Sequence, residues 1–318
     1  MKSKTAVIAI GGHALSNSDH AKTFSDEFAN TARTGRAIAE LIRDGWSVVM
    51  THGNGPQVGH LLTVMEKANE GGATHALPLF MCSAQTQGSI GLMLQQALGN
   101  ALHNLGIARP VISMITQVRV DPDDPGLLIP SKPVGPHFDA AQAQRLKQER
   151  GWIMQQRNNG QWRRVVPSPI PKEIIERDAI LAMLAANCVP IAVGGGGIPV
   201  IQTAEGLHGV DAVIDKDRSS ALLAHQLDTE LLVICTAVPY VMIDFQRPTE
   251  RIITRTSPEA LKQWAHEGQF EPGSMGPKIE AVLQFVDRPG RRAVICDDFH
   301  LLDASRGTAG TQIHLAST

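Results

Sequence analysis

Short apolar runs alternate along the chain with longer segments whose apolar residues recur every three or four positions. The short runs predict β-strands at residues 5–10, 46–51, 110–120, 189–193, 231–236, 251–254 and 292–296. The longer segments predict α-helices at residues 26–43, 84–105, 172–187, 219–226, 258–266 and 273–286. Because the two kinds of element alternate, we expect an α/β fold with a mostly parallel sheet covered by helices on both faces.

The segment from His137 to Pro171 interrupts this alternation. A polar helix at 139–150 precedes two runs at 152–154 and 162–166, and the turn Asn158-Asn159-Gly160 lies between these runs. The arrangement predicts a β-hairpin on an inserted subdomain. A hinged insertion beside a ligand site often works as a lid, and a dimer contact or an insertion without function is an equal alternative.

Four consecutive glycines, Gly194 to Gly197, follow the run 189–193 and precede Ile198-Pro199-Val200. Glycine costs conformational entropy and packs nothing, so four in a row favour a backbone that turns its N–H groups toward an anion. A flexible linker is the alternative, but linkers are seldom preceded by a strand and followed by Ile-Pro-Val. We therefore expect this turn to form one wall of an anion-binding pocket.

Two further predicted strands end in glycine-rich turns. The run 5–10 leads into Gly11-Gly12, and the run 46–51 leads into HGNGPQVG at 52–59. Such turns are typical of phosphate binding in α/β proteins. The second turn has the spacing G-x-G-x-x-x-G, and the acidic residue expected about twenty residues further on is not at the end of a predicted strand, which disfavours a Rossmann dehydrogenase. A Walker A motif is absent.

Three lysines, Lys132, Lys216 and Lys278, lie on turns rich in proline or glycine. Phosphoryl transfer requires mainly positioning and charge stabilisation, and an ammonium group suits phosphate oxygens. Asp215 and Asp217 flank Lys216, where they would hold it in place or assist a hydrated magnesium ion. One such lysine is more often a solvated surface residue, but three at turn positions favour a phosphate site.

Nucleophilic catalysis has little support in the sequence. Cys82 and Ser83 precede a predicted helix, but no histidine–aspartate pair is evident for them. His52 stands at the end of a predicted strand, where a ligand and a buried, hydrogen-bonded histidine are equally good interpretations.

The composition is that of a soluble globular protein, with 318 residues, 43% hydrophobic, 19% charged and a formal net charge of −2. The positive charges are scattered, so the sequence predicts neither a nucleic-acid nor a membrane surface. No apolar run reaches transmembrane length, and the N-terminus does not resemble a signal peptide. The four cysteines are far apart without a Cys-x-x-Cys motif, so we expect reduced thiols, no structural zinc and a cytoplasmic protein.

A series of motifs occurs in order along nearly the whole chain: AIGGHAL (9–15), HGNGPQVG (52–59), TQG (86–88), QVRVDPDDP (117–125), SKPVGP (131–136), RVVPSP (164–169), GGGGIPV (194–200), VIDKD (213–217), GSMGPK (273–278) and Gly310-Thr311. Each motif is weak by itself. Together they resemble the carbamate kinases of the amino acid kinase superfamily, and the set distinguishes these from the acetylglutamate, aspartate and uridylate kinases.

The resemblance implies a single domain over residues 1–318, built as a three-layer α-β-α sandwich with a central, mostly parallel sheet. It also implies a small protruding lid subdomain at 137–169 and a homodimer. The reaction would be reversible phosphoryl transfer between ATP and carbamate, with carbamoyl phosphate and ADP as the other pair. In cells the ATP-making direction is expected, in arginine or in purine and allantoin catabolism.

The resemblance also implies roles for the glycine turns. Gly11 and Gly12 would line the transferred phosphoryl group. The residues placed against the carbamoyl group or its phosphate are Gly53, Asn54, Gly195 and Gly196.

The charged residues receive roles in the same way. Lys132 would reach the substrate from the base of the lid. Lys216, oriented by Asp215, and Lys278 would bridge the nucleotide phosphates and the phosphoryl group in transfer. Magnesium would be held mainly by phosphate oxygens, with no protein metal site. The residues of the nucleotide pocket would be Thr236, Val238 and Met275, in addition to Lys216 and Lys278.

One position departs from the family pattern: asparagine is expected where this chain has His13. A histidine can also donate a hydrogen bond to the phosphoryl group, but its charge varies near neutral pH. We hypothesise that His13 keeps the asparagine role and makes turnover depend on pH, which the pH–rate profile of His13→Asn would test. A shifted acceptor, a weak enzyme and a tolerated substitution are the alternatives.

Two other functions stay open on the sequence alone. One is a related acyl-phosphate kinase with a different small carboxylate or carbamate as acceptor, which only His13 favours. The other is a non-catalytic ligand-binding relative, which the complete set of lysines and glycine turns disfavours.

Overall fold

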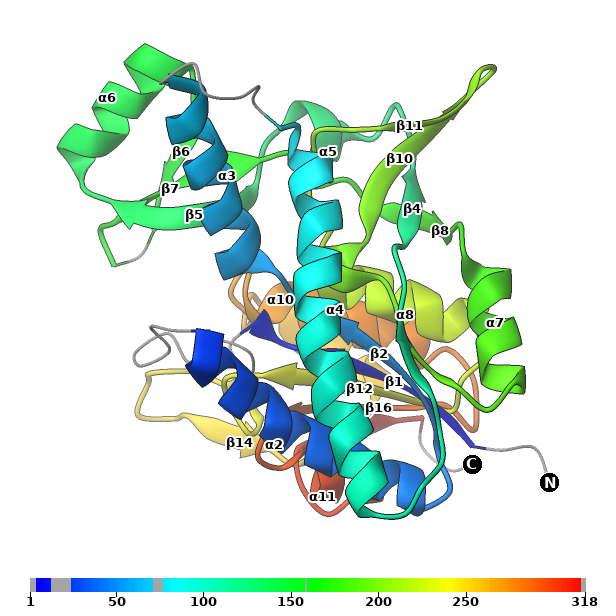
Figure 1. The fold of residues 1–318 in the computed structure, drawn as a ribbon. Coiled ribbons are helices and arrows are strands. Elements are labelled where there is room, and N and C mark those ends of the chain that lie inside the picture. Colours follow the sequence, from blue (N-terminus) through cyan, green and yellow to red (C-terminus); the bar gives the residue numbers. More distant parts are fainter. Residues whose placement is uncertain (1–3, 13–23, 71–76, 158, 316–318) are drawn as a thin grey trace.

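The computed structural model describes residues 4–12, 24–70, 77–157 and 159–315. Its largest element is an eight-stranded sheet with the strand order β15-β17-β16-β12-β1-β2-β9-β3 (Figure 1). In chain order these strands are β1 (Thr5–Ile10), β2 (Ser47–His52), β3 (Val111–Ser113), β9 (Val189–Ile191), β12 (Leu231–Thr236), β15 (Arg255–Thr256), β16 (Arg292–Asp297) and β17 (Thr311–His314).

The strands from β16 through β3 all pair in parallel, whereas β17 pairs antiparallel with β16. The central strands are buried on both faces; Val7 and Ile8 of β1, for example, point to opposite faces and neither is exposed. A strand buried on both faces has no need of polar alternation, which explains the continuous apolar runs in the sequence. The predicted mostly parallel sheet is confirmed.

Helices cover both faces of this sheet and complete the three layers (Figure 1). On one face Ile38, Leu94 and Leu301 share an apolar core with the sheet, and on the other Leu223 and Phe285 do so. The helices of the first face are α2 (Phe24–Arg43), α4 (Leu79–Asn104) and α11 (Leu301–Arg306), and those of the second face include α8 (Lys216–Gln226) and α10 (Met275–Phe285). The predicted fold class is therefore confirmed.

A four-stranded sheet, β11-β10-β4-β8, extends from the tetraglycine turn. Its strands are β4 (Gln117–Val120), β8 (Pro171–Ile174), β10 (Ile198–Thr203) and β11 (Gly206–Gly209), and helix α7 (Arg177–Ala185) follows β8. The predicted helix at 172–187 is thus wrong in its first part. Ile174 is buried there, and Glu173 forms a 2.8 Å cross-strand ion pair with Arg119, so tertiary pairing overrides the helical propensity of this segment.

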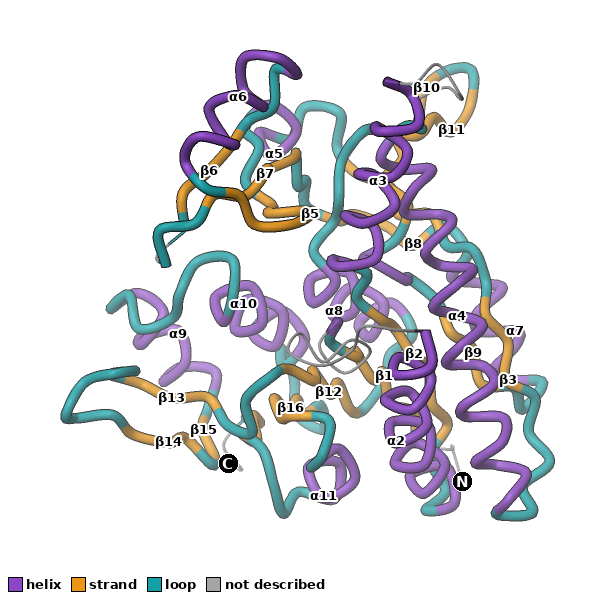
Figure 2. The backbone as a smooth tube through the Cα atoms, turned by 60° about the vertical axis from the view of Figure 1, so that its left-hand side comes forward, coloured by secondary structure: helices purple, strands orange, loops and turns teal. Residues whose placement is uncertain are grey.

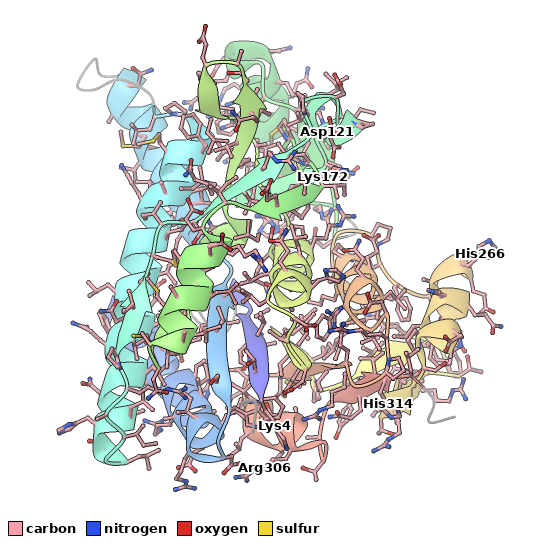
Figure 3. All side chains as sticks on the ribbon, turned by 90° about the vertical axis from the view of Figure 1, so that its right-hand side faces the viewer. Lys4, Asp121, Lys172, His266, Arg306 and His314 are labelled. Carbon is pink, nitrogen blue, oxygen red and sulfur yellow. The ribbon has the colours of Figure 1, made fainter. Side chains whose placement is uncertain are left out.

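The remaining elements flank these sheets. They are α3 (Gly55–Glu70), α5 (Pro125–Leu128), the short helix η1 (Gly194–Gly196), the paired strands β13 (Val241–Ile243) and β14 (Arg251–Ile253), and α9 (Pro258–His266). In the described part of the chain, no helix is both long and apolar enough to cross a membrane. Charged side chains such as Lys4, Lys172 and Arg306 point outward from separate elements (Figure 3).

A three-stranded antiparallel sheet stands apart from the central sheet (Figures 1 and 2). It contains β5 (Lys132–Phe138), β6 (Met154–Gln156) and β7 (Trp162–Val166), with α6 (Ala140–Arg150) between β5 and β6. The predicted hairpin is confirmed by the pairing of β6 with β7. We call residues 132–166 the β5–β7 subdomain; its first strand starts five residues before the predicted boundary at 137.

Two glycines form the contact between this subdomain and α3. A Cβ atom built on Gly59 of α3 would lie 2.4 Å from the Cα of Gly135 in β5. Gly135 itself has a φ of +72°, a conformation that L side chains rarely adopt. The helix and the strand therefore touch backbone to backbone at this point.

Gly59→Ala should push α3 and β5 apart at this contact. Because the added methyl group meets backbone atoms, β5 or α3 must shift, at a cost of about 1–3 kcal/mol in the free energy of unfolding. Gly99→Ala is the matched control, since a Cβ there meets nothing within 4 Å and should stabilise α4 by roughly 0.5–1 kcal/mol. Urea denaturation of both variants measures the difference, and equal stability of the two would contradict the close contact.

Candidate active site

A pocket lies where β1, β2 and β12 end and α8 begins. Ligand sites of open parallel sheets are expected at these carboxyl ends. The sequence-predicted residues that line it are Gly11, Gly12, Gly53, Asn54, Lys132, Gly195, Asp215, Lys216, Thr236 and Lys278. Among the other predicted residues, Val238 and Met275 line an adjoining pocket, Gly196 lies behind the wall, and His13 lies outside the described residues.

The turns after β1 and β2 touch through their backbones. A Cβ on Gly11 would lie 2.8 Å from the carbonyl oxygen of Cys235, and one on Gly53 would lie 3.1 Å from the backbone nitrogen of Gly12. The backbone N–H of Gly53 donates to the carbonyl oxygen of Ile10 at 2.9 Å. Side chains at these positions would force the strands apart, so the glycines let several backbones converge on one small space.

The tetraglycine turn is held in an unusual conformation. Val193, which precedes it, has a φ of 54°, and Gly195, Gly196 and Gly197 have φ values of 68°, 96° and 88°. A β-branched residue in the left-handed region is strained, and buried packing around Val193 holds it there. The turn is thus fixed in one shape rather than flexible, as expected for a wall that presents its backbone to a ligand.

Side chains of α4 and of the turn after β2 support this turn from behind. The Gln87 amide nitrogen donates to the carbonyl oxygen of Gly194 at 2.9 Å, and the Asn54 amide nitrogen donates to Thr86 Oγ1 at 2.9 Å. The Asn54 amide also lies against Gly195, where a Cβ would come within 2.2 Å of its nitrogen. The carbonyl oxygen of Gly196 accepts from Ser219 Oγ at 2.7 Å, so Gly196 connects the turn to α8.

Two aspartates hold the three lysines. Asp217 pairs with both Lys216, at 2.7 Å, and Lys278, at 3.0 Å. Asp215 pairs with Lys132 at 2.5 Å, and its other oxygen accepts from the backbone N–H groups of Asp217 and Arg218 at the start of α8. The expectation that Asp215 orients Lys216 is therefore wrong: Asp215 holds the lysine of the β5–β7 subdomain, and Asp217 orients Lys216.

The charges in this cluster stabilise one another. Burial alone would raise the pKa of the Asp217 carboxyl, but the charges of Lys216 and Lys278 outweigh burial and hold this pKa well below its usual range. Burial likewise opposes the charge of Lys278, yet the attraction of Asp217 prevails and raises the pKa of Lys278. The Asp217 carboxylate and the Lys278 ammonium group are consequently charged at neutral pH.

His52 lies next to this cluster as a neutral side chain. It is 1% exposed, and its Nδ1 lies 3.0 Å from the carbonyl oxygen of Gly53. Burial lowers the pKa of His52 from 6.5 to about 4, and the charge of Lys216 contributes to the lowering. Of the two interpretations of His52 from the sequence, the buried, hydrogen-bonded histidine is the one that the structure supports.

A larger pocket adjoins the first and shares Thr236 and Ser274 with it. Its volume is about 610 Å³, against about 180 Å³ for the first. In its wall, Gln269 accepts from the backbone N–H of Asp244 at 2.8 Å and donates to the Asp244 carboxylate at 3.2 Å. The larger pocket has room for a nucleoside and the smaller one for phosphate-sized groups.

The carboxylates of the first pocket fit poorly to a metal site of their own. Asp215 and Asp217 are both paired with lysines. Within the described ranges, no group of three or more His, Cys, Asp or Glu side chains is placed to hold a metal ion.

Comparison with known proteins agrees with this geometry. The model of the amino acid kinase family matches residues 4–297. The chain belongs to the amino acid kinase family. Within this family, it is 41% identical to the carbamate kinase of Thermococcus kodakarensis over 98% of this chain and 99% of that one. It is also 41% identical to carbamate kinase 2 of Enterococcus faecalis, over 96% and 97% of the two chains. The solved carbamate kinase of Giardia lamblia bound to AMP-PNP is 34% identical, with a TM-score of 0.90 and 99% of each chain covered.

Asp217 is the residue of the cluster to which the resemblance gave no role. The sequence placed it next to Lys216, but adjacency cannot show which of two aspartates meets which lysine. At the start of a helix, successive side chains point in different directions, and Asp215 is committed to capping α8. A capping pattern at Asp215 was the signal that could have assigned the two aspartates correctly.

The first prediction of this site concerns pH. Because the pKa of His52 is about 4 in the folded chain and 6.5 in its unperturbed state, the unfolded chain binds more protons between these values. The contribution of the neutral His52 to the free energy of unfolding is therefore fully present above pH 6.5. It is lost as the pH falls toward 4, which lowers the free energy of unfolding by on the order of 3 kcal/mol. Urea denaturation across this range should give a shallower pH slope for His52→Gln than for wild type, while the exposed control His208→Gln keeps the wild-type slope. Identical slopes in all three would show that His52 does not titrate as proposed.

The second prediction concerns the lysine cluster. Asp217→Asn keeps the shape of the side chain and removes the charge, so burial of Lys278 is no longer offset and its pKa should fall. A ¹³C NMR titration of the lysine ε-carbons measures this pKa. Asp178→Asn is the control, because Asp178 is 89% exposed and pairs with Arg177 away from the pocket. An unchanged Lys278 pKa in Asp217→Asn would refute the ion-pair arrangement.

Proposed function

We propose that this protein is a carbamate kinase, which transfers a phosphoryl group reversibly between ATP and carbamate. The observation that carries the proposal is the cluster of Lys132, Lys216 and Lys278 with two aspartates, in a pocket walled by three glycine turns. Full-length similarity to carbamate kinases supports the same assignment. Carbamate, carbamoyl phosphate, ATP and ADP are the substrates on this proposal.

The reaction needs positioning and charge rather than a protein nucleophile. In the ATP-making direction, a β-phosphate oxygen of ADP bonds to phosphorus while the bond from phosphorus to the carbamate oxygen breaks, and carbamate leaves as an anion. Neither the attacking nor the leaving oxygen carries a proton, so no general base is required. This agrees with a pocket in which His52 is neutral and faces a backbone carbonyl.

The lysines and the glycine turns would bind different parts of the substrates, according to where they lie in the pocket. Lys216 and Lys278 would neutralise the nucleotide phosphates and the phosphoryl group between them, because Asp217 keeps both ammonium groups at one place. The backbone N–H groups of Gly11, Gly12 and Gly53 would bind the phosphoryl oxygens, and Asn54 with Gly195 the carbamoyl group. Magnesium held by phosphate oxygens would supply further charge neutralisation.

Lys132 would bind the acceptor from the β5–β7 subdomain. In the structure its ammonium pairs with Asp215, whose second oxygen stays bound to α8. An anionic substrate competes for the same ammonium group, so binding would exchange one partner of Lys132 for another. The subdomain would thereby act as the lid over the pocket, with Lys132 as its contact to the substrate.

The larger pocket, lined by Thr236, Val238 and Met275, is proposed as the site of the nucleoside. Its shared boundary with the phosphate pocket supports this placement, since the phosphates of a nucleotide bound there would reach Lys216 and Lys278. The ATP-making direction in arginine or purine and allantoin catabolism, the cytoplasmic location and the homodimer stay predictions from the resemblance.

Turnover provides the test. Purified protein with MgADP and carbamoyl phosphate should form ATP, measured through hexokinase and glucose-6-phosphate dehydrogenase. Lys216→Ala should lower kcat by about 10²–10³-fold, because it removes a charge that contacts the transferred group. Lys172→Ala, an exposed lysine of β8, should leave the rate unchanged.

The same assay separates the alternatives. Acetyl phosphate in place of carbamoyl phosphate tests a related acyl-phosphate kinase. A folded protein that binds MgADP in calorimetry and forms no ATP from either compound would overturn the assignment.

A further inference from the structure

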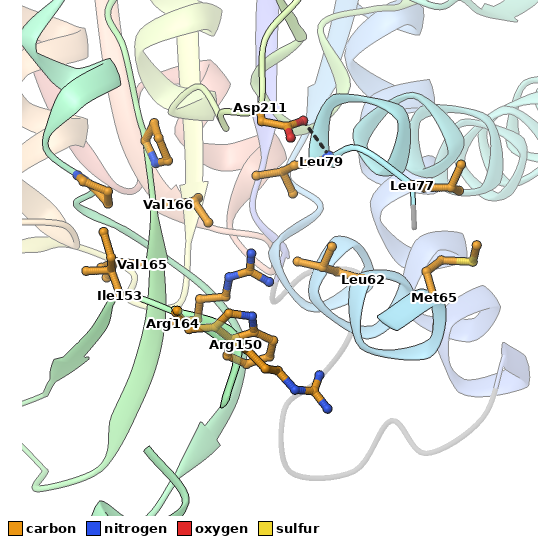
Figure 4. Close-up of a pocket in the computed structure, with 14 residues that line it drawn as sticks. Leu62, Met65, Leu77, Leu79, Arg150, Ile153, Arg164, Val165, Val166 and Asp211 are labelled. Atoms are coloured by element: carbon orange, nitrogen blue, oxygen red, sulfur yellow. Dashed lines mark hydrogen bonds between the residues drawn. The ribbon is translucent and has the colours of Figure 1, made fainter. Parts of the chain in front are cut away.

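A third cavity lies between the β5–β7 subdomain and the helices α3 and α4 (Figure 4). Its volume is about 380 Å³, within the range of about 300–1,000 Å³ that is typical of small-molecule sites. No residue of the two pockets described above lines it. The proposed reaction therefore leaves this cavity without a role.

Most of its wall is apolar. Leu62 and Met65 of α3 and Leu79 of α4 form one side, and Val165 and Val166 of β7 form the other (Figure 4). Ile153 lies at the rim and is 53% exposed, which leaves apolar surface in water beside the cavity. A ligand with an apolar body would remove this surface from water and gain the corresponding hydrophobic free energy.

The cavity also has positive charge, from two arginines that lie over one indole ring. The guanidinium carbons of Arg164 and Arg150 lie over the Trp152 ring, 4.4 Å and 5.4 Å from its centroid. A guanidinium stacked on a ring keeps its N–H donors in its own plane above the ring, where they suit a planar carboxylate. The one acidic residue of the lining, Asp211, accepts a hydrogen bond from the Leu79 backbone N–H at 2.9 Å at the start of α4.

Only a thin apolar layer separates this cavity from the phosphate pocket. Leu62, Leu79 and Val166 belong to the same buried cluster as Val58, Val134 and Val213, and these three valines line the phosphate pocket. Moreover, Val166 is the β-sheet partner of Lys132. A molecule in contact with Val166 therefore acts on the strand pair that carries the Lys132 ammonium.

We propose that this cavity is an effector site for an organic monocarboxylate with an aromatic or branched apolar body. The apolar body fills the space between α3 and β7, and the carboxylate meets Arg164 and Arg150. A bound molecule holds the paired residues Val166 of β7 and Lys132 of β5 at the position in which Lys132 pairs with Asp215. Binding therefore opposes the transfer of Lys132 to the substrate, a consequence that rests on the proposed function.

Calorimetry of the full chain with 4-phenylbutyrate tests the site itself and requires no turnover. Wild type should bind the compound, and 4-phenylbutanol, which lacks the charge, should bind at least about tenfold more weakly. Arg164→Gln and, separately, Arg150→Gln should raise the Kd for 4-phenylbutyrate by about tenfold. Arg145→Gln, a 67% exposed arginine of α6, should leave this Kd unchanged.

Three results would overturn the site. They are no heat of binding in wild type at millimolar concentration, equal affinity for the alcohol, and displacement of 4-phenylbutyrate by MgADP. Circular dichroism of each variant verifies that it is folded, and two independent arginine variants keep the test decisive if one of them is unstable.

The effect on catalysis is measured on the same preparations. Saturating 4-phenylbutyrate should raise the KM for carbamoyl phosphate by about fivefold or more and leave kcat within twofold, and Arg164→Gln should abolish this change. A KM change that persists in Arg164→Gln would place the compound in the active site and refute the proposal. Binding without any change in KM would refute the coupling. Absence of turnover in a protein that still binds 4-phenylbutyrate would reject the proposed function and not the site.

Discussion

The structure depends on one buried carboxylate that faces two ammonium groups. Three ammonium groups in a pocket this small repel one another, and burial opposes the charge of Lys278. Asp217 removes this conflict for Lys216 and Lys278, and Asp215 removes it for Lys132. The positive charge that phosphate requires can therefore be assembled in advance of the ligand, which is the condition for electrostatic catalysis without reorganisation.

The glycine turns provide the room that a small ligand needs beside these charges. Strands of a sheet lie about 4.8 Å apart, so a small ligand at their ends meets backbone before it meets side chains. Gly11, Gly53 and Gly195 leave that backbone accessible, and the buried packing around Val193 holds the tetraglycine turn in one conformation. The walls of the pocket are consequently rigid peptide groups, while its charges are side chains held by partners.

The layers of helices and central sheet could be predicted from the sequence. The pairing of β8 with β4 and the pairing of each aspartate with its lysine could not. Continuous apolar runs such as residues 5–10 are unambiguous because a strand buried on both faces tolerates nothing else. The helix predicted at residues 172–187 was wrong in its first part because lysine and glutamate favour helices, whereas the pairing of β8 with β4 depends on residues some fifty positions away. The site could be located from its turns, but which of Asp215 and Asp217 meets which lysine is decided by side-chain direction at a helix start, which periodicity does not reveal.

The contact of Gly59 with Gly135 has a mechanical consequence. It contains no ionisable group and no long side chain, so neither salt nor temperature-dependent side-chain motion alters it strongly. Three residues earlier in the same strand, the ammonium group of Lys132 meets the carboxylate of Asp215 in a charged hydrogen bond of 2.5 Å. The strand β5 is thus held at one point by the shape of two backbones and at another by an ion pair, and only the second contact depends on charge.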